Sequence, residues 1–175
     1  GHTEGDRLLR ELAVRLGATA EEAYRVSGIA EQVAAAGGEM EIMSSFKFVP
    51  ADMGAALDLR SCDIYEDVLN ADVVISVPIA KTHGLSQLTL GMKNRMGIMG
   101  GRRARIHRRI DENLVDVARV VKPTLTVLDA VRILTDSGPQ GGDLRDVRKL
   151  DTVAVSIDPV AVDAFGATLF GLKGS

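Results

Sequence analysis

The chain has 175 residues, enough for one domain with a sizeable core, and its 46% apolar and 26% charged residues are ordinary globular usage. Aromatic residues are scarce, with no tryptophan, two tyrosines and four phenylalanines, which argues against base-stacking platforms and makes nucleic-acid binding an unfavoured function. The formal net charge is -3, and no apolar run approaches the roughly 18 residues that a membrane span needs.

Regular spacing of apolar residues predicts two helices at the start of the chain. Leucines and an alanine at three- and four-residue spacing predict the first helix over 6–16. Thr19 and Glu22 have the spacing of a capping box, so a second helix is expected to run through Ala36 and to end at the glycines that follow. The next residues, 39–49, are expected to form a strand and its extended continuation.

The rest of the chain alternates between predicted helices and strands. Asp72–Pro78 is a continuous β-branched run, which is typical of a strand buried on both faces. Asp158 and Pro159 have the arrangement of an N-cap and a first helical residue. The other predicted elements are helices over 61–70 and 110–121 and strands over 124–129 and 152–157. Such alternation favours an α/β fold, and we expect a three-layer α/β/α arrangement with a mostly parallel sheet, in one domain over 1–175.

One stretch stands apart from the rest of the chain by its charge. Residues 81–109 hold eight lysines and arginines, two of the three histidines and no carboxylate, which leaves 13 basic against 24 acidic residues elsewhere. Such segregation suggests an anion site. The stretch follows a predicted strand, and ligands gather at the carboxyl ends of parallel strands. If all strands are parallel, Lys81 and His83 share one edge of the sheet with Asp129 and Asp158.

A series of motifs resembles the family called domain of unknown function 362. The matching residues are Ala71-Asp-Val-Val-Ile-Ser-Val-Pro-Ile-Ala-Lys-Thr-His83, Leu88-Thr-Leu-Gly-Met-Lys-Asn94, Arg105-Ile-His107, Ser137-Gly-Pro-Gln-Gly141 and Ile157-Asp-Pro-Val-Ala-Val-Asp163. Their order along the chain is more specific than any one of them. The resemblance covers about residues 19–172.

The resemblance implies little about activity, because the family has no settled reaction. Many members are associated with iron–sulfur clusters through a ferredoxin-like, cysteine-rich module. This chain has a single cysteine, Cys62, so no iron–sulfur cluster and no internal disulfide are expected within it, and its cofactor is left open. A lone cysteine fits a cytoplasmic location. Family members usually have further segments before and after the equivalents of Gly1 and Ser175, so the chain is also interpreted as a fragment of a longer member.

Four basic or polar side chains in the stretch are candidates for binding a phosphate or carboxylate. Lys81 and Lys93 would neutralise the charge of such a ligand, and Asn94 would orient it. Arg105 is favoured over the neighbouring arginines because it matches the family motif. A glycine-interrupted backbone after a strand would let a ligand approach closely.

His83 and His107 are the catalytic candidates, together with Lys81. An imidazole with a pKa near 6.5 can take or give a proton at neutral pH, and surrounding cations should lower that pKa and favour the neutral ring. No metal site is predicted, because Asp129 and Asp158 lack a supporting ligand spacing and Asp158 is better explained as a helix cap. The sequence leaves open whether the protein is an enzyme.

The sequence supports three alternative hypotheses about function. The first is binding of a small anionic metabolite, and the second is a substrate-binding role beside a separate ferredoxin-like iron–sulfur protein. The third is a non-enzymatic module whose arginine run docks on nucleic acid or an acidic protein. The structural alternative to all three is a solvated basic loop. Nothing in the sequence indicates the oligomeric state.

Overall fold

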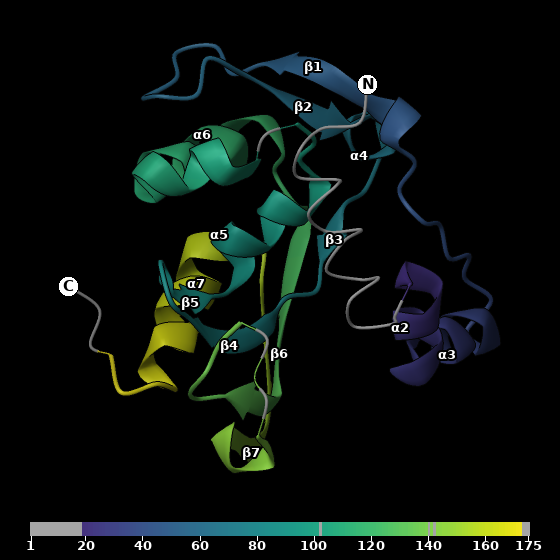
Figure 1. Ribbon diagram of the computed structural model, residues 1–175, viewed down its shortest axis with the longest axis vertical. Helices are drawn as coiled ribbons and strands as arrows, with labels where there is room; N and C mark the ends of the chain where they lie inside the picture. Colours follow the sequence, from purple (N-terminus) through teal and green to yellow (C-terminus); the bar gives the residue numbers. More distant parts are fainter. Residues whose placement is uncertain (1–18, 102, 140, 142, 173–175) are drawn as a thin grey trace.

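The computed structural model describes residues 19–101, 103–139, 141 and 143–172 (Figure 1). The helix predicted over 6–16 lies outside the described residues. The α-helices are α2 (Ala20–Val26), α3 (Ile29–Ala35), α4 (Glu66–Asn70), α5 (Gly91–Asn94), α6 (Ile110–Val120) and α7 (Pro159–Thr168). The strands are β1 (Phe48–Asp52), β2 (Ser61–Tyr65), β3 (Ile75–Ser76), β4 (Ile79–His83), β5 (Gln87–Thr89), β6 (Leu125–Leu134) and β7 (Val147–Ser156). Short 3-10 helices are η1 (Ser45–Lys47), η2 (Arg95–Ile98), η3 (Arg103–Arg109) and η4 (Leu144–Asp146).

A five-stranded mixed sheet forms the centre of the fold. β3 and β4 pair in parallel with the first and second halves of β6, while β5 pairs antiparallel with β4 and β7 antiparallel with β6. Pro78 separates β3 from β4, because its ring nitrogen has no hydrogen to donate to the ladder. Its carbonyl oxygen still accepts the N–H of Asp129 at 2.8 Å. The α/β class predicted from the sequence is confirmed.

The candidate aspartates do not lie where the sequence predicted, partly because β7 is antiparallel to β6. Because β7 runs antiparallel to β6, its end lies beside the start of β6. Asp158 follows that end, so it is at the opposite end of the sheet from Lys81 and His83 in the second half of β4. Asp129 lies in the middle of β6 rather than at its end. The expectation that these groups share one strand edge is therefore wrong.

The helix predicted to run from Thr19 through Ala36 is two shorter helices in the structure. The Thr19 hydroxyl accepts the N–H of Glu22 at 3.1 Å, which confirms the predicted cap. Gly28, at a φ of 76°, then breaks the predicted helix into α2 and α3. A left-handed φ of this kind cannot continue an α-helix, and glycine adopts it at little cost.

Two segments before the central sheet differ from their predicted structure. Residues 61–65 were expected to be helical but form β2, which pairs along its whole length with β1, and only 66–70 are helical. Pairing with β1 buries Ile64 completely, so tertiary packing overrides the local helical pattern. The strand expected near 39–45 is absent from these residues, and β1 begins at Phe48.

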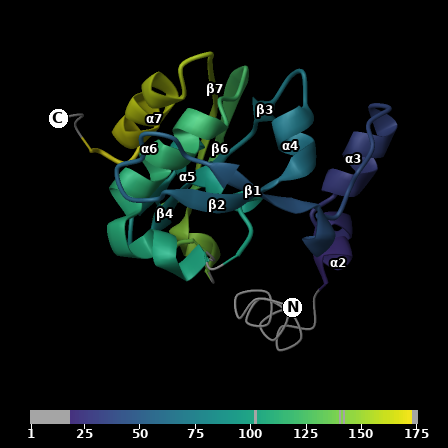
Figure 2. The same cartoon turned by 90° about the horizontal axis from the view of Figure 1, so that it is seen from above.

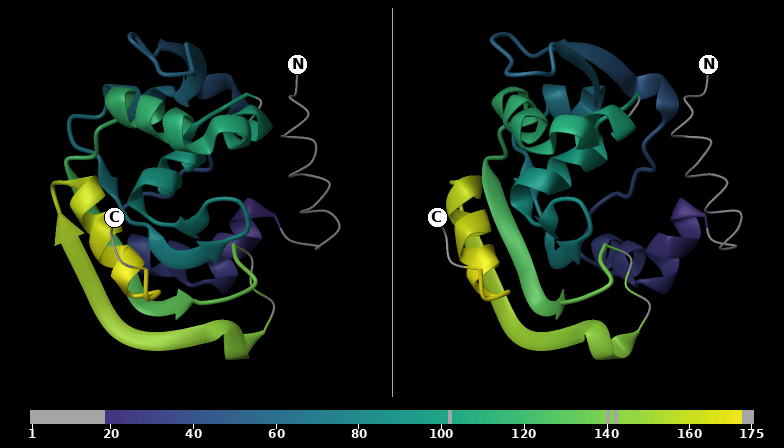
Figure 3. Two further views of the ribbon diagram at one scale, coloured as in Figure 1. Left: turned by 90° about the vertical axis from the view of Figure 1, so that its left-hand side faces the viewer. Right: turned by 60° about the vertical axis from the view of Figure 1, so that its left-hand side comes forward.

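Helices α5 and α7 pack on one face of the sheet. Figure 3 shows α7 beside β6 and β7, and Figure 1 shows α2 and α3 on the other side of the strands. The buried side chains between the sheet and the helices are Ala80, Leu90, Leu128, Ala130, Ile133 and Val162. The opposite face carries aliphatic side chains that are about half exposed, among them Ile75, Val77, Val153 and Val155. The hydrophobic core of the sheet therefore lies on the face that α5 and α7 cover.

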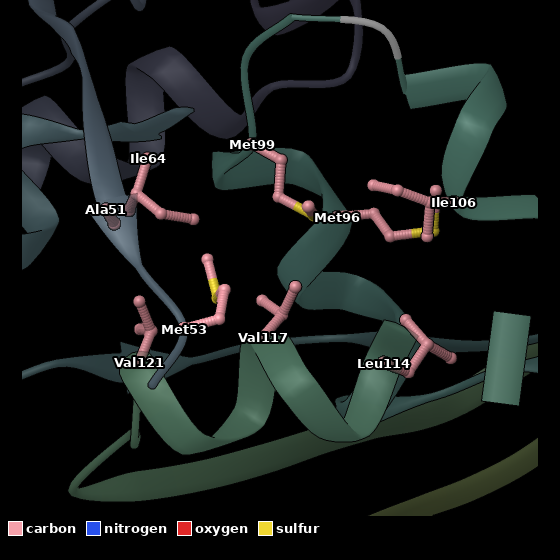
Figure 4. Close-up of a cluster of buried hydrophobic side chains, with 9 residues drawn as sticks. All are labelled: Ala51, Met53, Ile64, Met96, Met99, Ile106, Leu114, Val117 and Val121. Carbon is pink, nitrogen blue, oxygen red and sulfur yellow. The ribbon is translucent and has the colours of Figure 1, made fainter. Parts of the chain in front are cut away.

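A second core joins α6 to the β1–β2 pair. Figure 2 shows β1 and β2 crossing one end of the molecule near α6, and Figure 4 shows the side chains between them. These are Ala51, Met53, Ile64, Met96, Met99, Ile106, Leu114, Val117 and Val121. Met96, Met99 and Ile106 come from the basic stretch, so its apolar residues fix it to the body of the protein. No helix among the described residues has the length and apolar character to cross a membrane.

Candidate functional site

The β4–β5 hairpin presents Lys81 and His83 on one side. Alternate residues of a strand point to the same face, and these two are separated by Thr82 alone. Thr89 lies directly opposite Lys81 in the antiparallel ladder, so its side chain shares that face. The Thr89 hydroxyl is buried and has no hydrogen-bond partner among the described residues.

Lys93 reaches the same region from α5, which begins two residues after β5 ends. Its side chain is partly buried, and burial lowers the pKa of its ammonium group. The positive charge of Lys81 lowers that pKa further. The two lysines therefore act on each other electrostatically, although they are 12 positions apart in the chain.

His107, on η3, brings a second histidine to the site. Its ring is stacked with the ring of His83, with 6.2 Å between the centroids and 10° between the planes. Burial lowers the pKa of His83, and the charges of Lys93, His107 and Lys81 lower it further. The structure thus brings together Lys81, His83, Lys93 and His107, which we call the basic cluster.

Backbone contacts select the tautomer of His83. Its Nδ1 accepts the N–H of Leu85 at 3.1 Å and that of Ser86 at 3.3 Å. A nitrogen that accepts these bonds carries no proton, so the neutral ring carries its proton on Nε2. A second proton would have to displace the backbone donors from Nδ1. The lowered pKa agrees with the neutral imidazole expected from the sequence.

The two lysines of the basic cluster have no carboxylate partner in the described part of the chain. None of the ion pairs there involves Lys81 or Lys93. Among the described residues, the Lys93 ammonium makes a long hydrogen-bond contact of 3.7 Å to the sulfur of Met96. A positive site of this kind is able to receive an anion.

Asn94 and Arg105 are not joined to the basic cluster by any described contact. The Asn94 amide nitrogen donates to the Ser76 hydroxyl at 3.3 Å, which directs it toward the end of β3. Arg105 lies on η3 with His107 but is exposed. Of the six candidates, the described ring contact and charge effects therefore link four and do not include these two.

The loop that begins at Ser137 packs directly on β4. A Cβ atom added to Gly138 would lie 1.9 Å from the carbonyl oxygen of Thr82, the residue between the two cluster residues of β4. Only a residue without a side chain fits at this approach. The family resemblance singled out the motif Ser137–Gly141, but the sequence alone did not explain why position 138 needs a glycine.

Sequence reasoning also missed two charged residues next to α5, namely Asp163 and Arg95. Asp163 accepts the N–H groups of Gly91 and Met92, and Arg95 is a buried cation whose charge acts on that carboxylate. Asp163 was noted only as part of a motif, and Arg95 only as one of many basic residues. The contact between α5 and α7 joins residues about seventy positions apart, which no local pattern reveals.

Metal binding finds no support in the described residues, among which no group of three or more His, Cys, Asp or Glu side chains could hold an ion. Asp158 instead caps α7, since its Oδ1 accepts the N–H of Val160 at 2.8 Å and of Ala161 at 3.2 Å. The predicted cap is confirmed. Asp129 uses its Oδ1 to accept the N–H of Val131 at 2.9 Å.

Comparison with known proteins places these motifs in a wider group. A family model described as "Domain of unknown function (DUF362)" matches residues 5–168. A protein of Synechocystis sp. named "Thylakoid-associated protein sll1697" is 35% identical over 106 residues. That match covers 56% of this chain and 32% of the relative, so the matched segment spans about a third of the relative's length. Every motif quoted above, and all four residues of the basic cluster, fall within the residues matched by the family model.

Proposed function

The chain belongs to the DUF362 family, and from its basic cluster we propose that it binds a small anionic metabolite that carries phosphate or carboxylate. The observation that supports this most is the pair of lysines without a described carboxylate partner beside two stacked histidines. Like charges held together cost free energy, and a bound anion offsets that cost. Among the described residues, no carboxylate forms an ion pair with Lys81 or Lys93.

Each residue of the basic cluster has a role in this proposal. Lys81 and Lys93 make charge-assisted hydrogen bonds to the ligand oxygens. His83 donates from Nε2, because its Nδ1 is held by the backbone. His107 lies against the His83 ring and is the second candidate for moving a proton on the bound ligand.

Asn94 and Arg105 contribute at the periphery of the proposed site. Asn94 is on the same short helix as Lys93, so it would contact a ligand that extends toward β3. Arg105 is exposed and would meet a ligand group that leaves the cluster toward solvent. Their effects on affinity should therefore be smaller than those of the two lysines.

Calorimetric titration with inorganic phosphate tests the proposal. The double variant Lys81→Met/Lys93→Met should bind phosphate at least about tenfold more weakly than the wild type, because it loses two charge-assisted bonds. Methionine keeps much of the apolar stem, so the fold should be retained. The matched control is Lys122→Met/Lys149→Met, which removes two exposed lysines outside the cluster.

Three results are informative. Binding in the wild type and control but not in the cluster variant supports the proposal. Equal affinity in all three proteins, or no binding of phosphate and of a carboxylate probe such as citrate to the wild type, contradicts it. Titration at two salt concentrations identifies a non-specific charge effect. In that case, phosphate affinity would fall in the control variant as much as in the cluster variant.

A further inference from the structure

We propose that Asp163 is a positioning residue for the basic cluster, holding Lys93 in place by capping α5 from the neighbouring helix α7. The inference rests on the proposed function, because the position of Lys93 matters for a ligand only if the cluster binds one. It assigns a role to a buried carboxylate far from the basic stretch in sequence. It also explains the need for glycine at position 91.

Asp163 supplies the cap that α5 lacks. Its Oδ1 accepts the N–H of Gly91 at 2.6 Å and its Oδ2 accepts that of Met92 at 2.9 Å. These are the first two N–H groups of the helix, which have no partner within it. Leu90, at the N-cap position, offers no side-chain hydrogen bond. The carboxylate therefore replaces a local cap through a contact between two helices.

Close packing fixes the carboxylate against the helix. Gly91 is buried, and a Cβ atom there would lie 2.8 Å from Asp163 Oδ1 and 3.1 Å from Thr126 Cγ2. A side chain at position 91 would thus push the carboxylate away from the N–H groups. Burial raises the pKa of Asp163, while the bonds from Met92 and Gly91 and the charge of Arg95 oppose that rise.

Arg95 provides the compensating charge. It is only 4% exposed, and its side chain hydrogen-bonds the sulfur of Met92 at 3.2 Å. Its Nε is buried and has no partner among the described residues. Burial lowers the pKa of Arg95, and the charge of Asp163 acts in the opposite direction. Loss of Asp163 would leave this cation buried without its counter-charge, which is costly.

Lys93 depends on this arrangement because α5 has a single turn, Gly91–Asn94. A helix of this length has no stability of its own and is held by its tertiary contacts. When the cap is lost, Lys93 should move away from His83 and Lys81. Of the three charges that act on His83, those of Lys81 and His107 would then remain and that of Lys93 would be lost.

The pKa of His83, followed by NMR titration of its ring protons, separates positioning from a direct charge effect. Removing the negative charge of Asp163 would by itself lower the pKa of His83. Losing Lys93 from its side raises that pKa, since a positive neighbour is removed. We therefore expect Asp163→Ala to raise the pKa of His83 toward the value found in Lys93→Met, and Asp163→Asn to produce a smaller rise.

Gly91→Ala is the second variant, and it keeps the carboxylate while displacing it from α5. It should also raise the pKa of His83, so the inference remains testable if Asp163→Ala does not fold. An unchanged or lowered pKa of His83 in Asp163→Asn and Gly91→Ala would overturn the inference. That result together with a lower melting temperature would assign Asp163 a purely structural role.

Phosphate titration of the same proteins keeps this inference distinct from the proposed function. We expect Asp163→Asn to bind phosphate about fivefold more weakly, as one of two capping bonds is lost. If the wild type does not bind phosphate or citrate, the proposed function fails. The pKa of His83 still decides whether Asp163 positions Lys93, because that measurement needs no ligand.

Discussion

Two lysines of this protein have opposite surroundings. The Lys47 ammonium lies 2.7 Å from Glu41 Oε1 and 2.8 Å from Asp67 Oδ2, and these hydrogen bonds raise its pKa. The Tyr65 hydroxyl donates to the same Glu41 oxygen at 2.6 Å. At Lys93, burial and the charge of Lys81 lower the pKa instead. One lysine is neutralised within the chain and the other is not.

The comparison separates a structural cation from one available to a ligand. The bonds of Lys47 fasten the segment before β1 to α4, and Ser44 adds a bond from its N–H to the Tyr65 hydroxyl at 3.3 Å. All the charges there have partners, so no ligand is needed. In the basic cluster, neither Lys81 nor Lys93 forms an ion pair with a carboxylate of the described residues. Lys47 and Lys93 therefore differ in whether the described part of the chain supplies a carboxylate partner for the ammonium group.

The largest expected effect comes from Gly138→Ala, which should disrupt the basic cluster and leave the Lys47 contacts in place. The added Cβ would collide with the Thr82 backbone, so β4 or the loop must shift. We expect the free energy of unfolding to fall by about 2–3 kcal/mol, as for other overpacked sites, and phosphate affinity to fall with it. Thermal and urea denaturation measure the change.

Gly84→Ala is the matched control for that substitution. It lies in the turn after β4, and a Cβ there would meet nothing within 4 Å. Its stability should stay within about 0.5 kcal/mol of the wild type. Equal stability of the two variants would show that the loop does not press on β4 and that the cluster does not depend on it.

A smaller effect is expected in the pH dependence of stability. The pKa of His83 is lower in the folded protein than its ordinary value, so the folded state binds this proton less readily than the unfolded state. The stability from the neutral ring is present above pH about 6.5 and is lost as the pH falls through the folded-state pKa. His83→Gln should flatten this part of the profile. A profile identical to that of the wild type would remove His83 as its source.

Local sequence signals predicted some parts of the structure correctly. The Asp158-Pro159 pair marked the start of α7, and the helix predicted over 110–121 agrees with α6, because such signals act within a few residues. The β-branched run before Lys81 correctly placed the basic stretch next to the central sheet. However, only Ile75–Ser76 of that run is a strand, and most of its aliphatic side chains are about half exposed rather than buried on both faces. The histidines and lysines of the cluster followed from that position and from the family motifs.

Other features depend on contacts that the sequence does not display. Ser61–Tyr65 became a strand only because β1 lies beside it, and β7 took the antiparallel direction that placed Asp158 away from the cluster. The bond from Asp163 to the start of α5 crosses 72 positions. The exposure of Arg105 was likewise not evident from the sequence.

The most direct test of the proposed anion site is the pKa of Lys93, measured by NMR of its side chain with and without saturating phosphate. We expect a pKa below the ordinary lysine value in the free protein and a rise when phosphate binds, because the anion stabilises the charged ammonium. Lys47 serves as the internal reference and should not change. A Lys93 pKa that is already at or above the ordinary value, or that is unmoved by saturating phosphate, would contradict the claim.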